Sequence, residues 1–488
     1  MLRRKLKLYT YHTFLVVPFI VLFLYAHNLE LSKLNMTYRT LLFGTLFCLL
    51  LYGITQVIFR NRLKTGVFVT LVLFALFQYG VIYEFLEAMY YRGLWPLKNI
   101  HRYLIGFYLV VLSAVFWWAK KTKYDFIRLN YFLNALVILL LMFNLFKIAA
   151  YNYPDPAKKR GNQYILEKTI RFRADDRPNI YYIILDGYAN NLVLEKYYSF
   201  KNTSFTSHLK EQGFVFCDSA FSNYYYTFPS LASTLNFDYI NDSIPQSELI
   251  RQNRLFSILK ANRYTISHLK SGYAVSSSFM LADKTITIDG PNEFEKSLLK
   301  FTILRLDDLI GFFAHSRLKS QFKKMYELSA SNEKPKFCFI HIVAPHPPYI
   351  FDREGGIQIK HQFAEHSWEP KSFYVDQLVY VNRQMEKFTA SILEQDKNAV
   401  ILLQSDHGPW IKGSADEVFE ARSKILYAYY SPKKLNIPSR SSSVNTFRYV
   451  LNGVFNAELP LLTDSAAGKT KLMADPIFVK KIGELKTP

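Results

Sequence analysis

Cysteine is scarce in this chain of 488 residues: it has three, and one of them, Cys48, lies inside a long apolar run. The other two, Cys217 and Cys338, fall in separate hydrophobic segments of the later part. So few cysteines exclude a small secreted scaffold held by many disulfides, and they exclude a zinc module built mainly from thiolates. With 50% hydrophobic and 20% charged residues, the chain is also too apolar to be intrinsically disordered. A folded protein of several domains is therefore expected.

Acidic residues are nearly missing from the first 150 residues, which hold 17 Lys and Arg against 4 Asp and Glu. The remaining residues hold 43 against 35, so most of the net charge of +21 lies in the amino-terminal part. The same part contains five apolar runs, each close to the ~20 residues that a helix needs to cross ~30 Å of hydrocarbon. The runs cover residues 11–28, 40–59, 66–86, 103–119 and 130–150. We predict a five-span transmembrane domain over residues 1–150.

The basic residues beside these runs are unevenly divided between the two sides of the predicted membrane domain. Eleven Lys and Arg lie before the first run and in the loops after the second and fourth runs, whereas the loops after the first and third runs hold five. By the positive-inside rule, the amino terminus is cytoplasmic and the chain after about residue 151 lies outside the cytoplasm. We therefore expect an integral protein of the cytoplasmic membrane with a periplasmic or extracellular domain. Because so many basic residues are orientation signals, the pI near 9.5 does not indicate nucleic-acid binding.

Two features are expected near the outer membrane surface. Glu84 and Glu87 have the spacing of one helix face close to the outer end of the third run. They are placed to contact a lipid headgroup, although interfacial carboxylates are more often simply solvated. Residues 151–175 form a basic stretch, which we interpret as a juxtamembrane linker or a surface helix lying against anionic headgroups.

The hydrophobic pattern changes after residue 175 to short apolar runs separated by helical segments. The runs at 179–186, 336–343 and 398–404 are continuous, which is typical of strands buried on both faces. A helical pattern over 374–394 lies between the last two. This alternation predicts an α/β domain with a mainly parallel central sheet over residues 176–460, followed by a polar carboxy-terminal tail, 461–488.

Polar residues follow two of the predicted strands: Asp186 ends the first, and Asp406 and His407 follow the last. Ligands of parallel sheets bind beyond the carboxyl ends of the strands, and two carboxylates with an imidazole suit zinc or manganese better than calcium. Taken singly, each Asp would serve equally well as a helix cap. Thr227 begins a helical pattern, so its hydroxyl either caps the helix or acts as a nucleophile that a metal activates beside the helix amides. We predict Thr227 as the nucleophile.

Four sequence boxes resemble, in order and spacing, the motifs of the sulfatase-like branch of the alkaline phosphatase superfamily. They are Leu185-Asp186-Gly187, Thr227-Phe-Pro229-Ser230, His341-Ile-Val-Ala-Pro345-His346-Pro-Pro348-Tyr349 and Ser405-Asp406-His407-Gly408. Five membrane spans before such a domain are similar to the architecture of lipoteichoic acid synthases and phosphoethanolamine transferases. The resemblance implies one divalent metal ion (Mn, Zn or Mg) as cofactor. Its implied ligands are Asp186, Thr227, Asp406 and His407.

Departures from the family pattern narrow the expected chemistry. Sulfatases need Cys or Ser, oxidised to formylglycine, where this chain has Thr227, and they usually have Arg where it has Leu231. Sulfate-ester hydrolysis is therefore disfavoured. Gly187 stands where many sulfatases have a second Asp, which favours one metal over two. A second metal would need other ligands, for which the candidates are His341, Asp352, His361 and His366.

The predicted reaction is a phosphotransfer in two steps. Thr227 attacks the phosphorus of a phospholipid headgroup, releases diacylglycerol and keeps phosphoglycerol or phosphoethanolamine as a phosphothreonine ester; a hydroxyl of an envelope glycan or glycolipid then accepts the group. His346 is predicted to protonate a leaving oxygen or hold a phosphate oxygen, and a purely structural histidine in a proline-rich loop is its alternative. Weaker candidates for substrate contact, which ordinary surface positions would explain equally well, are Lys270, Arg353 and Trp368.

Two other functions stay open at this point. A membrane-tethered phosphodiesterase, phosphatase or sulfuric-ester hydrolase, with water as acceptor, would carry the same boxes. A non-catalytic membrane partner in envelope polysaccharide assembly is the second alternative, and the intact set of Asp, Thr, Asp and His argues against it. The membrane anchor favours the transferase, because a lipid donor confined to the bilayer needs a site near the membrane surface.

Overall fold

The computed structural model divides into two compact units. One segment of the later part of the chain, Pro291–Ile310, belongs to the first unit and is called the exchanged segment below. The first unit is Met1–Pro154 with Pro291–Ile310, and the second is Asp155–Gly290 with Gly311–Pro488. The chain therefore crosses between the units three times, which the sequence pattern did not indicate. The structure describes residues 9–29, 32–91, 94, 96, 99–152, 170, 172, 177–240, 244–273, 276–305, 307–331, 333–358 and 368–465.

The five apolar runs of the first unit form helices. Their bounds are α1 Tyr11–Ala26, α2 Tyr38–Phe59, α3 Arg62–Tyr91, α4 Ile100–Lys121 and α5 Ile127–Asn152, with a 3₁₀ turn η1 at Leu34–Thr37. The last four are long and apolar enough to cross a membrane, which indicates a membrane protein. The first, α1, has 16 residues, fewer than the ~20 of a typical span, and packs through Val16 into a core with α2, α3 and α5.

A short amphipathic helix from the later part of the chain, α12 (Glu293–Phe301), belongs to the first unit. Its Phe294 is buried with Leu24 of α1, while Phe301 packs against Phe77 of α3. Ion pairs of Glu295 and Arg305 hold the segment Pro291–Ile310, which contains α12. Arg39 donates two hydrogen bonds to Glu295, at 2.8 and 2.6 Å.

The two carboxylates near the carboxyl end of the third apolar run are engaged by the same segment. Arg305 donates to Glu84 at 2.7 Å and lies 3.9 Å from Glu87, and its guanidinium stacks on Tyr83. The Arg305 side chain is 10% exposed, whereas Glu84 remains 49% exposed. Glu84 and Glu87 are therefore ion-paired within the protein, a partner that the sequence spacing did not identify.

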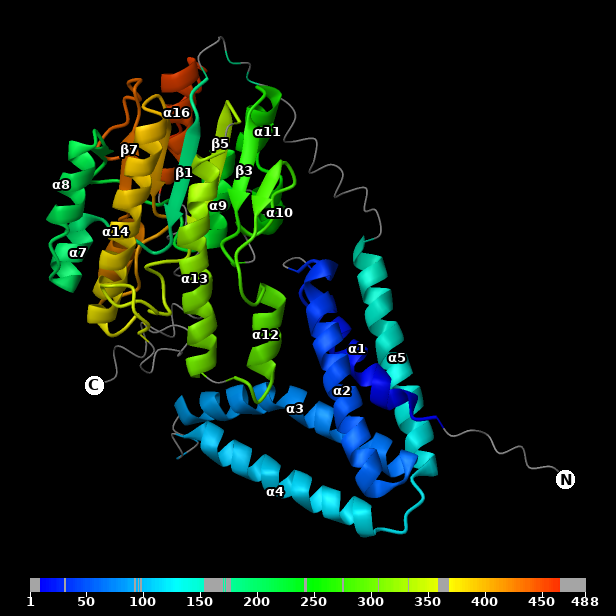
Figure 1. The fold of residues 1–488 in the computed structure, drawn as a ribbon. Coiled ribbons are helices and arrows are strands. Elements are labelled where there is room, and N and C mark those ends of the chain that lie inside the picture. Colours follow the sequence, from blue (N-terminus) through cyan, green and yellow to red (C-terminus); the bar gives the residue numbers. More distant parts are fainter. Residues whose placement is uncertain are drawn as a thin grey trace. The chain divides into compact units, whose positions relative to one another are not determined.

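The second unit is built on a sheet of seven strands in the order β2-β7-β6-β1-β5-β3-β4. The strands are β1 Ile180–Leu185, β2 Val215–Phe216, β3 Thr265–Leu269, β4 Lys284–Ile286, β5 Lys336–Ile342, β6 Val400–Gln404 and β7 Tyr427–Tyr430. Strand β7 pairs antiparallel with both neighbours, and the other pairings are parallel. The expected mainly parallel sheet is confirmed, with β1 at its centre between β5 and β6 (Figure 1).

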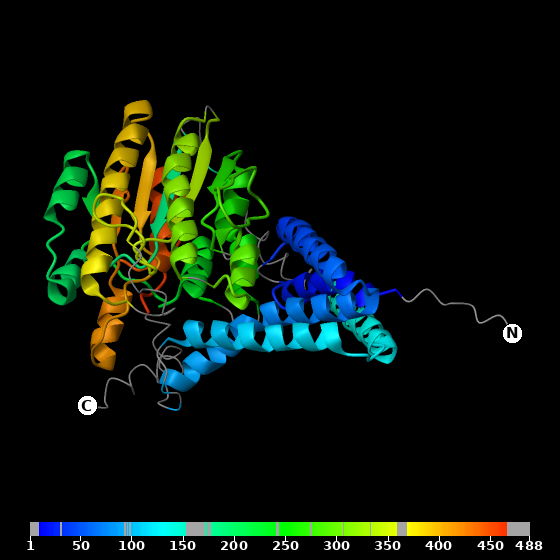
Figure 2. The same cartoon turned by 60° about the horizontal axis from the view of Figure 1, so that its bottom comes forward.

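Helices cover both faces of this sheet, as two views of the fold show (Figure 1, Figure 2). One face carries α7 Asn191–Tyr198, α8 Thr203–Glu211, α13 Asp307–Ser329, α14 Lys371–Gln395 and α15 Ala415–Ser423. The other carries α9 Thr227–Asn236, α10 Gln246–Arg251, α11 Arg254–Ala261 and α16 Thr446–Phe455. Alternate residues of β1 enter the two cores, Ile183 on one side and Ile184 on the other, which is why this strand is apolar throughout.

Candidate active site

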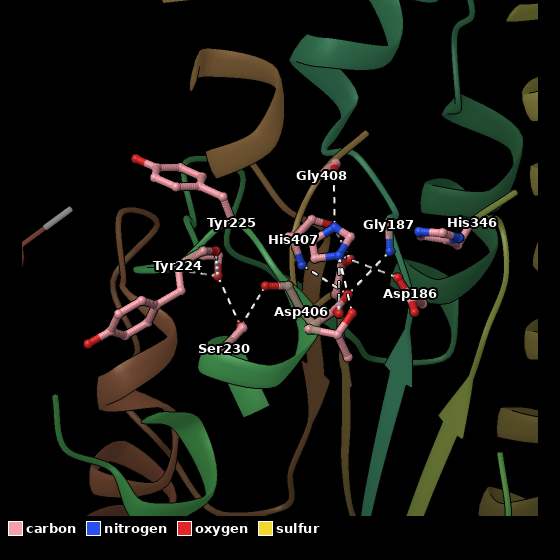
Figure 3. Close-up of polar contacts among 12 residues, drawn as sticks. Asp186, Gly187, Tyr224, Tyr225, Ser230, His346, Asp406, His407 and Gly408 are labelled. Carbon is pink, nitrogen blue, oxygen red and sulfur yellow. Dashed lines mark hydrogen bonds and ion pairs between the residues drawn. The ribbon is translucent and has the colours of Figure 1, made fainter. Parts of the chain in front are cut away.

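Two carboxylates and an imidazole meet at the carboxyl ends of the neighbouring strands β1 and β6 (Figure 3). Asp186 directly follows β1, and Asp406 and His407 lie just after β6; all three are buried. Potential ligand atoms of the three lie within 4.8 Å of one another. His407 Nε2 is 3.6 Å from Asp186 Oδ1 and 3.5 Å from Asp406 Oδ2. Three side chains that can each offer a metal-ligand atom, from the ends of two strands, thus lie together.

Unsatisfied atoms make this cluster a suitable metal site. Among the residues that the structure describes, Asp186 Oδ1 and Asp406 Oδ2 are buried without a hydrogen-bond partner. Buried polar atoms normally have partners, so two bare carboxylate oxygens side by side fit a bound cation. His407 Nδ1 lies 3.0 Å from the Gly408 carbonyl, which can only accept, so Nδ1 carries the proton. The Nε2 lone pair is then free to act as a metal ligand.

Burial and mutual repulsion set the protonation states of these groups. Burial and the neighbouring Asp186 charge raise the pKa of Asp406 to about 7. Burial also raises the pKa of Asp186, but His346, His341 and His407 lower it by more, so its pKa falls below the usual range. Burial, and then the Arg422 charge, hold the pKa of His407 well below its usual value. Without a cation, Asp186 is therefore ionised, Asp406 titrates near neutral pH, and His407 is a neutral imidazole.

Thr227 is the first residue of α9, and its side chain reaches the same cluster. Its Oγ1 is 3.3 Å from His407 Nε2, and the residue is 6% exposed. The backbone N–H groups of Thr227 and Phe228, in the first turn of α9, have no intrahelical acceptor, and the helix dipole makes this end attractive to anions. Ser230, one turn further, donates its hydroxyl to the Asp406 carbonyl at 2.6 Å (Figure 3). The Ser of the Thr-x-Pro-Ser box thus ties the helix that carries Thr227 to the loop that carries Asp406.

The two histidines of the third box both lie against Asp186. His341, in β5, is fully buried with Nε2 at 3.5 Å from Asp186 Oδ2 and Nδ1 at 2.6 Å from Ser276 Oγ. His346 is half-buried in the loop after β5; its backbone N–H donates to the Asp186 carbonyl at 3.0 Å. Its ring centre lies 6.1 Å from that of His407. His346 is therefore next to the cluster and, unlike Asp186, Asp406 and His407, is partly exposed.

The weaker substrate candidates are placed very differently. Trp368 is buried beside the cluster, with its ring 4.8 Å from the His346 ring. Lys270 follows β3 at the same edge of the sheet, where it is half-buried. Arg353 instead makes an exposed ion pair with Asp376 at 2.6 Å. The structure thus brings Trp368 to the site, leaves Lys270 at the edge, and engages Arg353 on the surface.

Of the four candidates for a second metal, the structure describes His341 and Asp352, which lie apart. His341 lies beside the first cluster. Asp352 accepts the backbone N–H groups of Glu354 and Gly356 in an exposed turn. His361 and His366 lie outside the described residues.

Sequence reasoning missed one large residue, Arg422. It lies on α15 and is 1% exposed; its guanidinium donates to the Gly408 carbonyl at 2.8 Å and to the Tyr225 carbonyl. An arginine in a polar helical segment gives no signal of burial, so only the tertiary structure reveals it. The ties made by Ser230 and Ser276 are likewise invisible in sequence, because they depend on which segments meet.

A sulfatase family model matches residues 178–434, slightly more than half of the chain. The chain belongs to the sulfatase family. All four sequence boxes lie inside the matched range, so the resemblance drawn from them is confirmed. No curated protein matches this sulfatase-family chain.

Solved structures similar to this sulfatase-family chain include membrane enzymes and their soluble domains. The periplasmic domain of EptC from Escherichia coli, in complex with Zn, has a TM-score of 0.43 and 12% identity over 60% of this chain and 89% of that one. Lipooligosaccharide phosphoethanolamine transferase A from Neisseria meningitidis, an integral membrane protein, has a TM-score of 0.39 and 13% identity over 92% and 94%. The lipoteichoic acid synthase LtaP from Listeria monocytogenes has a TM-score of 0.38 and 13% identity over 60% and 77%.

Proposed function

We propose that this protein is a membrane-anchored, metal-dependent phosphotransferase. It moves phosphoglycerol or phosphoethanolamine from a phospholipid to an envelope glycan or glycolipid through a phosphothreonine ester. The observation that carries the proposal is the position of Thr227 Oγ1, at the start of α9 and 3.3 Å from His407 Nε2. A threonine, which is not the Cys or Ser from which formylglycine is made, beside two buried carboxylates suits phosphoryl transfer rather than sulfate-ester hydrolysis.

One divalent cation (Mn, Zn or Mg) would be held by four side chains. These are Asp186, Thr227, Asp406 and His407. When bound, the cation lowers the pKa of the threonine hydroxyl and offsets the negative charge of the phosphate. The unpartnered oxygens of both carboxylates and the neutral imidazole match the donors that such a cation takes.

The first chemical step forms the bond between Thr227 Oγ1 and phosphorus. Thr227 Oγ1 enters the step as an alkoxide, its proton having passed to solvent water, and attacks as the bond from phosphorus to the diacylglycerol oxygen breaks. The free amides at the start of α9 stabilise the charge that develops on the phosphoryl oxygens. His346, half-buried beside the cluster, donates a proton to the leaving oxygen. Diacylglycerol departs and the phosphothreonine ester remains.

The second step reverses these roles. An acceptor hydroxyl gives its proton to His346 and attacks phosphorus as the bond to Thr227 Oγ1 breaks. Trp368, packed on the His346 ring, restricts that ring to one side of the site. The helices of the first unit would hold this reaction at the outer face of the cytoplasmic membrane, with the amino terminus in the cytoplasm.

The test uses the full-length protein purified in detergent, supplied with Mn²⁺ and labelled phosphatidylglycerol or phosphatidylethanolamine. We expect diacylglycerol release and a label on Thr227; Thr227→Ala should lower the release by more than about a thousandfold. Thr234→Ala is the matched control, because Thr234 is a buried threonine of the same helix. Full activity in Thr227→Ala would refute the assignment of Thr227 as the nucleophile. Cleavage of a soluble phosphodiester without lipid turnover would favour the tethered hydrolase.

A further inference from the structure

The guanidinium of Arg422 is sealed inside the second unit and makes no ion pair with a carboxylate of the residues that the structure describes. The residue is 1% exposed, and both of its hydrogen-bond acceptors are backbone carbonyls, those of Gly408 and Tyr225. Its Nε has no hydrogen-bond partner among the described residues. Burying a charge without an ion-pair partner is costly, and the charges of Asp406 and Asp186 nearby offset part of this cost.

Aromatic rings and a helix end compensate part of this cost. The Arg422 guanidinium carbon lies 4.9 Å from the ring centre of Trp410, 5.7 Å from Tyr226 and 5.9 Å from Trp368. Cations over aromatic faces are stabilised, more strongly when they are desolvated. Arg422 also occupies the last turn of α15, where the helix dipole favours a positive charge. The cation is therefore held in one place from several sides.

The two carbonyls that Arg422 joins belong to the two halves of the active site. Tyr225 lies two residues before Thr227, and Gly408 directly follows His407. The bond to Gly408 is reciprocal, since the Gly408 N–H donates to the Arg422 carbonyl at 2.8 Å. A Cβ at position 408 would come within 1.9 Å of the Ala421 carbonyl oxygen, so only glycine permits this approach.

The Gly408 carbonyl has a second partner, which connects Arg422 to the expected metal ligand. It accepts from His407 Nδ1 at 3.0 Å as well as from Arg422 Nη1 at 2.8 Å. The first of these bonds fixes the proton on Nδ1 and turns Nε2 toward Asp186 and Asp406. Holding the carbonyl in place therefore holds the imidazole of His407 in its ligating orientation.

We propose that Arg422 is a positioning residue, which locks the Asp406–Gly408 loop to the Tyr225–Thr227 turn and so sets His407 and Thr227 against each other. Its effect on turnover rests on the proposed phosphotransfer, whereas its effect on the metal site does not. Arg422 touches no substrate in this scheme. It acts through two backbone carbonyls, each of which accepts from a different nitrogen of the planar guanidinium.

The test compares two variants with a matched control in the full-length protein. Arg422→Lys keeps the charge but offers one ammonium nitrogen on a shorter side chain in place of two guanidinium nitrogens, so it cannot reproduce the geometry of both bonds, and Arg422→Gln removes the charge. The control is Arg448→Gln, because Arg448 is also buried and also donates to two backbone carbonyls, those of Phe237 and Pro460. For each protein we measure the Mn²⁺ affinity, the absorption spectrum of the Co²⁺-loaded form and the thermal midpoint in chelator. We also measure kcat and KM for the lipid donor.

We expect both Arg422 variants to bind Mn²⁺ at least about tenfold more weakly, with an altered Co²⁺ spectrum. Their kcat should fall about 10–100-fold with a smaller change in KM, since the reacting groups are displaced rather than the lipid contacts. Arg448→Gln should lose thermal stability and keep its Mn²⁺ affinity and Co²⁺ spectrum.

Two results would overturn the inference: wild-type Mn²⁺ affinity and spectrum in Arg422→Lys, or an equal loss of affinity in Arg448→Gln. The first decides the matter even if Arg422→Gln does not fold. If the wild-type protein turns over no phospholipid but the Mn²⁺ pattern holds, the phosphotransferase proposal fails and the positioning role stands.

Discussion

At the scale of single residues, the site depends on side chains that hold backbone carbonyls in place. Ser230 donates to the Asp406 carbonyl, and Arg422 donates to the Gly408 carbonyl. Neither residue reaches a carboxylate or imidazole of the metal cluster directly. They fix the loop after β6, and this loop presents Asp406 and His407. Substitutions at such positions should therefore alter the site without deleting any ligand.

Ser230→Ala should lower kcat about 10–100-fold and weaken Mn²⁺ binding, because the Asp406 carbonyl loses the donor that ties it to α9. Ser233→Ala is the control. Ser233 is equally buried on the same helix, and its hydroxyl donates to the Asp238 carbonyl at 2.8 Å, away from the cluster. Each loss should cost about 1–3 kcal/mol of unfolding free energy. If both variants bind Mn²⁺ alike, the tie at Ser230 has no special role.

Asp406 makes the stability of the metal-free protein depend on pH. Its pKa is raised to about 7 in the folded state, against about 3.9 when unfolded. The stability that comes from its protonated form is complete below the unfolded pKa and is lost as pH rises through the folded pKa. Metal binding should reverse this trend, since a ligating carboxylate must be deprotonated.

Asp406→Asn imitates the protonated carboxyl and should raise the thermal midpoint in chelator more at pH 8 than at pH 5. The gain at pH 8 should be on the order of 1–2 kcal/mol. Asp186→Asn is the contrasting variant, because the pKa of Asp186 is lowered and its charge is favoured by nearby histidines; it should destabilise instead. Neither variant should be stabilised by Mn²⁺. Equal gains in the thermal midpoint of Asp406→Asn at pH 5 and pH 8 would contradict a raised pKa of Asp406.

At the scale of elements, the parallel strands of the second unit place the candidate site, and α12 of the exchanged segment packs into the first unit. Strands β5, β1 and β6 are neighbours with the same direction, so the residues after β1 and β6 must emerge at one edge. In the first unit, α12 comes so close to α3 that a Cβ on Gly80 would lie 2.2 Å from the Lys300 carbonyl oxygen. This tight packing and the ion pairs of Arg305 hold the exchanged segment.

Arg305→Glu should loosen the exchanged segment, because a third carboxylate would face Glu84 and Glu87. We expect trypsin to cut the detergent-purified protein at Lys296 and Lys300 about tenfold faster, as the open population rises. Lys324→Glu is the control, since it breaks an ion pair with Asp289 in the second unit. Unchanged cleavage in Arg305→Glu would show that apolar packing alone holds α12.

At the scale of the whole molecule, the membrane helices and the sulfatase-family domain are joined by three passages of one chain. The predicted orientation rests on basic loops, and it places the second unit outside the cytoplasm. All three native cysteines are free and buried, so added cysteines can report on topology with little background.

Lys397→Cys, exposed in the second unit, should react with a membrane-impermeant maleimide on intact spheroplasts. Lys123→Cys, exposed between α4 and α5, should react only after the membrane is permeabilised. The reverse pattern would invert the topology and would remove the phospholipid leaflet assumed for the donor.

Periodicity and local motifs determined a large part of this protein. Long apolar runs fixed the membrane helices, and continuous apolar runs such as 179–186 fixed the central strands, because burial on both faces excludes polar residues. The four boxes identified the family and named Asp186, Thr227, Asp406 and His407, whose side chains the structure brings together. These features are encoded within short windows of the chain.

Only the tertiary structure decided the contacts between distant segments. The capture of residues 291–310 by the first unit, the pairing of Arg305 with Glu84, and the burial of Arg422 between two carbonyls join positions that no local pattern relates. An arginine has the same sequence signature on a surface as in a core; its neighbours alone decide whether its charge is solvated or used. The sequence thus determined the elements and the residues of the proposed site, while packing determined how those residues are held, since hydrogen bonds to backbone carbonyls leave no mark on side-chain patterns.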